Sequence, residues 1–81
     1  MLLHWRNKHT ARYYTIHLQR DLLGDWSLTL AWGGARHKAV RVVHRAVASE
    51  RAGLAAIARI TRQREAHGYE LVDVDFAARP G

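Results

Sequence analysis

The chain has 81 residues, enough for one compact domain and too few for two, so we expect a single domain over residues 1–81. Hydrophobic residues make up 48% of the chain, which excludes a disordered tail. Thirteen Lys and Arg against seven Asp and Glu give a net charge of +6, and most of these cations are Arg, whose planar guanidinium suits an anionic partner.

The N-terminal segment and the hydropathy pattern bear on the cellular location. His4 and Arg6 interrupt the first apolar residues, so the start does not resemble a signal peptide. No apolar run approaches the length of a transmembrane helix, and the chain contains no Cys. We therefore expect a cytoplasmic protein without a membrane partner.

Alternating hydrophobicity predicts four strands in the first half of the chain. The segments are Leu2–Arg6, Tyr13–Arg20, Asp25–Trp32 and Ala39–Val47. The residues expected on the buried faces of the first three are Leu3 and Trp5, then Tyr14, Ile16 and Leu18, then Trp26, Leu28, Leu30 and Trp32. Gly33 and Gly34 are expected to end the third strand. Short connections favour antiparallel pairing.

The period then changes to that of a helix. Ser49 is a good N-cap and Gly68 a good stop signal, so a helix is expected between them. Its expected apolar side carries Leu54, Ile57, Ile60 and Thr61, while Arg51, Arg59 and Arg62 are expected to face solvent. Residues Tyr69–Phe76 predict a last strand, with Val72, Val74 and Phe76 in phase. The predicted fold class is α+β, a small antiparallel sheet of four to five strands with one helix packed on it.

A basic stretch follows the strand that ends at Trp32. Trp26 to Ser49 contains no acidic residue but carries Arg36, Lys38, Arg41 and Arg45. These cations are suited to follow a nucleic-acid backbone, and a solvated polar strand face is the alternative interpretation. Trp32 is similarly open to two interpretations, since it could stack on a base or belong to the core.

The order of these features resembles the WGR domain, named for a Trp-Gly-Arg motif and found in poly(ADP-ribose) polymerases and small bacterial proteins. The matching residues are Arg12, Tyr13 and Tyr14 leading into Ile16 and Leu18, Gly24 before the motif strand, Trp32 and Gly33 at its end, and Gly68 with Tyr69 after a basic helix. The resemblance implies a twisted antiparallel sheet crossed by one helix. It also implies nucleic-acid binding, because in the polymerases the motif Trp and Arg are described as contacting a DNA end.

This chain departs from the family at the motif Arg, which is Gly34 here, while the usual Gly two places further is Arg36. Trp32 inherits the contact by position, and Arg36 could replace the missing Arg if the turn redirects its side chain.

Other site chemistries find little support in the sequence. There is no phosphate-binding loop motif, and the six His show no ligand spacing. Asp73 and Asp75 are better explained as charges on an edge strand than as metal ligands. No Ser has an evident His and Asp partner. We therefore expect no metal, no cofactor, no small-molecule substrate and no enzymatic activity.

The sequence thus predicts a domain that binds nucleic acid with little sequence specificity, with DNA favoured over RNA as the partner. The expected contact residues are Trp32, Gly33, Arg36, Lys38 and Arg41, followed by Arg12 and Arg45. A protein–protein adaptor is the alternative, because Trp and Arg are also enriched at interface hot spots. A homodimer formed through an exposed edge strand is a third hypothesis.

Overall fold

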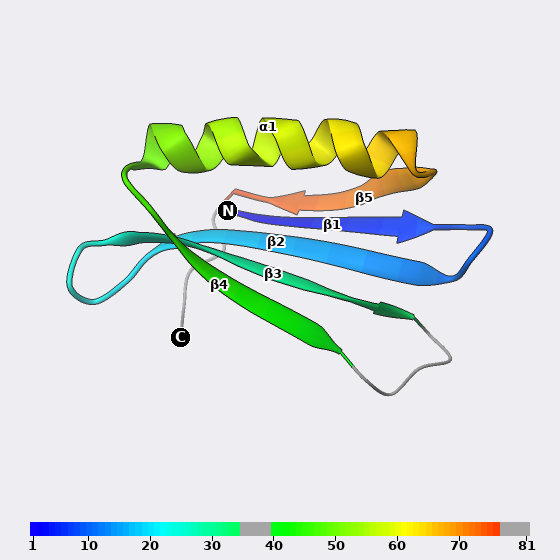
Figure 1. Ribbon diagram of the computed structural model, residues 1–81, viewed down its shortest axis with the longest axis horizontal. Helices are drawn as coiled ribbons and strands as arrows, with labels where there is room; N and C mark the ends of the chain where they lie inside the picture. The colour runs from blue at the N-terminus through cyan, green and yellow to red at the C-terminus, as the bar shows by residue number, and fades with distance from the viewer. Residues whose placement is uncertain (35–39, 77–81) are drawn as a thin grey trace.

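The computed structural model describes residues 1–34 and 40–76, which form an α+β fold (Figure 1). Its elements are β1 (Leu2–Asn7), β2 (Arg12–Arg20), β3 (Trp26–Gly34), β4 (Arg41–Val47), α1 (Glu50–Ala66) and β5 (Tyr69–Asp75). The strands form one five-stranded sheet in the order β4-β3-β2-β1-β5, and every neighbouring pair is antiparallel. The predicted fold class is therefore confirmed. No helix in the described residues combines the length and apolar character needed to cross a bilayer.

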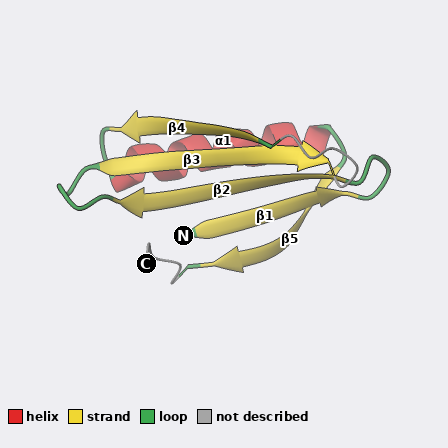
Figure 2. Cartoon of the chain, turned by 90° about the horizontal axis from the view of Figure 1, so that it is seen from below, coloured by secondary structure: helices red, strands yellow, loops and turns green. Residues whose placement is uncertain are grey.

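The core lies between one face of the sheet and α1. Alternate residues of the first three strands point to this face, as period-2 geometry requires. Trp5 and Ile16 are fully buried at its centre. Figure 2 shows the strands in front of α1, so the opposite sheet face has no described helix over it. The faces predicted for Leu2–Arg6, Tyr13–Arg20 and Asp25–Trp32 are thus confirmed.

Helix α1 begins where the sequence predicted. The Ser49 hydroxyl oxygen accepts a hydrogen bond from the Ala52 N–H at 3.0 Å, which satisfies one of the free donors of the first turn. Gly68 follows the helix with φ +84°, the left-handed conformation that glycine adopts at low cost.

The buried side of α1 differs from the prediction at one position. Gly53, Ala56 and Ile57 are buried, whereas Leu54 is 41% exposed. A Cβ on Gly53 would lie 2.5 Å from Leu18 Cδ1, so the helix is closest to the sheet at the residue without a side chain. Leu54, the next residue along the helix, therefore lies beside this contact and not at its centre.

Two strand predictions are also wrong in detail. Gly33 and Gly34 do not interrupt β3 after Trp32 but are its last two residues, paired with Tyr13 and Arg12 of β2. In β5 the register shifts by one residue, so that Leu71 pairs with Trp5, Asp73 pairs with His4 and Val72 has no partner on β1. This bulge removes Val72 from the buried phase and leaves it 53% exposed. Phe76 is 77% exposed beyond the strand end.

Candidate nucleic-acid interface

Antiparallel pairing brings several of the predicted contact residues to one face of the sheet. Residues directly opposite in an antiparallel pair point to the same side. Trp32 pairs with Arg41, Leu28 pairs with Arg45, and Arg12 pairs with Gly34. Because Leu28 is a core residue, Arg12, Trp32, Arg41 and Arg45 all lie on the face that carries α1. They span β2, β3 and β4, on the side of the sheet away from β5.

The remaining predicted residues are not part of this group. Gly33 alternates to the opposite sheet face, where a Cβ would lie 3.1 Å from the hydroxyl oxygen of Tyr13. The glycine therefore makes room for the Tyr13 ring. Arg36 and Lys38 lie outside the described residues.

Trp32 packs partly against the core and is partly exposed. Its ring stacks on that of Tyr14, with centroids 5.7 Å apart and planes inclined by 11°. It packs against the core cluster but stays half-buried. One part of the indole thus belongs to the core, and the remaining part is accessible to a ligand.

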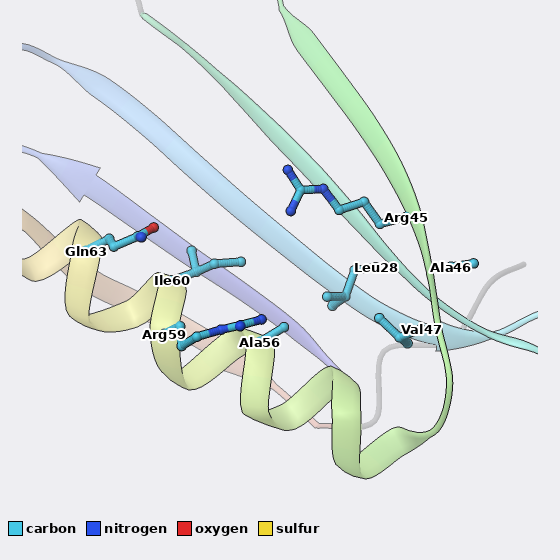
Figure 3. A pocket seen from close by; sticks show the side chains of 8 residues that line it. All are labelled: Leu28, Arg45, Ala46, Val47, Ala56, Arg59, Ile60 and Gln63. Carbon is cyan, nitrogen blue, oxygen red and sulfur yellow. The ribbon is translucent and has the colours of Figure 1, made fainter.

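A groove separates α1 from strands β3 and β4. In Figure 1 these strands slope away from the helix, and Figure 2 shows α1 behind them, so the helix crosses their face at an angle. The groove encloses about 350 Å³. Its apolar lining consists of Leu28, Ala46, Val47, Ala56 and Ile60. Its polar lining consists of Arg45 from β4 with Arg59 and Gln63 from α1 (Figure 3).

Arg59 and Gln63 are site residues that the sequence prediction missed. Arg59 is exposed, as expected, but it lines the groove instead of pointing away from the sheet. The signal was present in the helical spacing, because Arg59 and Gln63 lie three and seven residues after Ala56. Once Ala56 is known to face the sheet, both side chains follow on that side of the helix.

The charges of the sheet are separated toward its two edges. Glu70, Asp73 and Asp75 lie on the edge strand β5, and Arg41 and Arg45 lie on the opposite edge strand β4. Within residues 1–34 and 40–76, Arg41, Arg45 and Arg59 have no carboxylate within ion-pair distance, whereas Lys8 Nζ lies 3.2 Å from Glu70 Oε2. The groove side is therefore a surface of uncompensated positive charge.

Tyr14 is a core residue that lies close to the positive charges of Arg64 and Arg45. Burial raises the pKa of its hydroxyl, while the charges of Arg64 and Arg45 oppose that increase. The Arg64 guanidinium lies 4.6 Å from the centre of the Tyr14 ring, a cation–π contact between the end of α1 and β2.

The described part of the chain contains no group of three or more His, Asp or Glu side chains arranged to hold a metal ion. Comparison of the chain with protein-family models, curated proteins and solved structures finds no match.

Proposed function

We propose that this domain binds nucleic acid, DNA in preference to RNA, through the face that carries Trp32, Arg41 and Arg45. The observation that carries the proposal is the grouping of uncompensated arginines around a half-buried Trp on one side of the sheet. Arg12 extends the surface on β2, and Arg36 and Lys38 belong to the connection between β3 and β4. The resemblance to WGR domains supports DNA as the partner, since Trp32 and Gly33 occupy the motif positions.

Each residue type has a defined part in this interaction. Arg guanidinium groups form paired hydrogen bonds with phosphate oxygens and stay charged at every physiological pH. The accessible part of Trp32 offers a plane for a sugar or base. Phosphate contacts carry no sequence information, so a surface dominated by Arg should bind with little sequence specificity.

Fluorescence anisotropy with labelled oligonucleotides tests the proposal. The substrates are a duplex with a recessed 5′-phosphate, the same duplex with a 5′-hydroxyl, and a single strand. If three phosphates are neutralised, affinity should fall roughly 40-fold between about 50 and 200 mM salt, because the log–log slope is near −0.9 per phosphate on duplex DNA. Replacing Arg41 and Arg45 with Glu should abolish most of this binding.

The matched control is the pair Arg51→Glu and Arg62→Glu, which changes the net charge equally on exposed helix positions that do not line the groove. Equal losses in both double variants would show that overall charge, and not this face, determines affinity. Absence of binding to all three substrates at low salt would refute the proposal.

The alternative of a protein–protein adaptor is favoured by a different feature. Leu22 and Leu23, in the turn between β2 and β3, are 104% and 88% exposed. Such side chains are typical of a docking contact with another protein. A complex formed this way should persist at high salt, because apolar contacts are not screened.

A further inference from the structure

We propose that the groove between α1 and strands β3 and β4 is a pocket for one unpaired nucleotide. Its base would rest on the apolar lining, and its phosphate would lie between Arg45 and Arg59. This inference rests on the proposed function and narrows it to strands that carry an unpaired base at an end, a gap or a flap.

The lining of the groove suits a flat apolar ring. Leu28 is 2% exposed and Ala56 is 8% exposed, so they form a closed floor. Val47 and Ile60 are half-buried beside them, and Figure 3 shows Ile60 extending from the helix toward the strands. A base that covers the exposed parts of Val47 and Ile60 removes apolar surface from water on both partners.

Two positively charged side chains, Arg45 and Arg59, border this apolar lining. Arg45 projects from β4 and Arg59 belongs to α1, so the groove is flanked by guanidinium groups from both walls. Neither has a carboxylate partner in the described part of the chain. An anion held by these guanidinium groups would receive charge-assisted hydrogen bonds, which are about twice as strong as neutral ones.

Gln63 adds a group suited to the edge of a base. It lies one helical turn after Arg59 and lines the same groove. Its side-chain amide has no hydrogen-bond partner within residues 1–34 and 40–76, so its donor and acceptor are both available. An amide can pair with the donor and acceptor groups that every base presents.

The dimensions of the groove favour one unpaired nucleotide over a duplex. Its volume of about 350 Å³ is near the lower limit of the roughly 300–1,000 Å³ that small-molecule pockets span. Bases in a duplex are stacked and paired inside it, so only an unpaired base can reach an apolar floor.

The pocket is also distinct from the Trp32 contact. Leu28 and Trp32 lie four residues apart on the same face of β3, which corresponds to about 13 Å along the strand. One bound strand can therefore use Trp32 and the groove at different nucleotides.

The test compares a blunt duplex with a duplex of the same phosphate count that has a short 3′ overhang. The wild-type protein should prefer the overhang by on the order of tenfold, because only the unpaired base can cover the apolar side chains of the groove and bring its phosphate to Arg45 and Arg59. Arg59→Met should remove most of this preference, because it keeps an apolar side chain and loses the charge. Arg62→Met, the same change at a helix position that does not line the groove, should keep it. Gln63→Leu supplies a second, independent variant, and thermal unfolding checks that all variants fold.

A second measurement does not depend on any variant. Titration with adenosine 5′-monophosphate, followed by two-dimensional NMR, should shift the methyl signals of Leu28, Val47 and Ile60, whereas inorganic phosphate should leave them in place. Salt-sensitive binding with equal affinity for both duplexes would refute the nucleotide pocket and leave the proposed function standing. The same conclusion would follow if adenosine 5′-monophosphate left the methyl signals unshifted. Failure to bind either duplex would refute both.

Discussion

The ring of Trp32 lies on the ring of Tyr14 in an offset stack, with centroids 5.7 Å apart and an interplanar angle of 11°. Tyr14 also meets Trp5 edge-on, with centroids 6.3 Å apart. The proposed contact residue is thus connected to the fully buried centre of the core through a single aromatic side chain. A base that stacks on Trp32 would meet a ring whose orientation the core already fixes, so little conformational entropy would be lost on binding.

Replacing Trp32 should therefore affect both stability and binding. Trp32→Ala should lower the free energy of unfolding by roughly 1–3 kcal/mol, less than the ~3–5 kcal/mol expected for the fully buried Trp5. Trp32→Phe keeps a ring for the stack and should recover most of both properties. Urea denaturation followed by circular dichroism, with anisotropy in parallel, measures the two effects. Unchanged stability in Trp32→Ala would contradict the stack.

Replacing Gly33, unlike replacing Trp32, should not affect nucleic-acid binding. Its position on the other sheet face, against Tyr13, separates it from the arginines. We predict that Gly33→Ala leaves nucleic-acid affinity unchanged within error, while Arg41→Ala lowers it. Anisotropy on the same labelled duplex makes the comparison. An affinity loss in Gly33→Ala without a loss of stability would show that the bare backbone of Gly33 does contact the ligand.

The contact between Gly53 and Leu18 predicts a destabilising helix substitution. At a solvent-exposed position inside a helix, replacing Gly with Ala stabilises the protein by about 1 kcal/mol. Here the new Cβ would lie 2.5 Å from Leu18 Cδ1, a side chain that is 3% exposed, so overpacking of about 1–3 kcal/mol should outweigh that gain. Chemical denaturation of Gly53→Ala, Leu18→Ala and the double variant tests the contact. The double variant should lose less than the sum of the singles, because the new methyl occupies part of the space that Leu18 leaves.

The sequence predicted the local structure well where one physical signal dominated. Strand alternation located the buried faces that carry Trp5, Ile16 and Leu30, because period-2 burial is a property of the strand itself. Ser49 located the helix start, because capping depends on adjacent residues.

The features that the sequence did not predict depend on contacts between distant segments. The bulge at Val72 depends on pairing with β1, at the other end of the chain. The exposure of Leu54 depends on Leu18 meeting Gly53. Arg59 was predicted to face solvent because helical periodicity alone placed it on the side of the helix away from the sheet. Its place in the groove depends on how far β4 diverges from α1.

The N-cap of α1 provides a prediction with a conservative control. Ser49→Ala removes the acceptor for the Ala52 N–H and should lower the free energy of unfolding by about 1 kcal/mol. Ser49→Asp keeps an acceptor at the positive end of the helix dipole and should retain the stability. Thermal or urea unfolding measures both. Equal loss in the two variants would indicate that the hydroxyl contributes through packing and not as a cap.

Tyr14 should make stability depend on pH in the alkaline range. Burial raises the pKa of its hydroxyl above the ordinary value of 10.0, against the opposing charges of Arg64 and Arg45. The folded state therefore holds the phenolic proton more tightly than the unfolded state. Its contribution to stability is complete below pH 10.0 and is lost as the pH rises from there through the raised pKa.

The variant Tyr14→Phe keeps the ring stacked on Trp32 and removes the titrating group. Urea denaturation at a series of pH values should show wild type and variant separated by a constant difference below pH 10.0, with wild type losing stability faster than the variant above it. Arg64→Met should raise the pKa of Tyr14 further, because it removes the largest opposing charge. Ultraviolet titration of the tyrosinate band measures that change directly. Equal alkaline slopes for wild type and Tyr14→Phe would mean that the hydroxyl is solvated in the folded protein, and that the stack leaves the Tyr14 edge open to water.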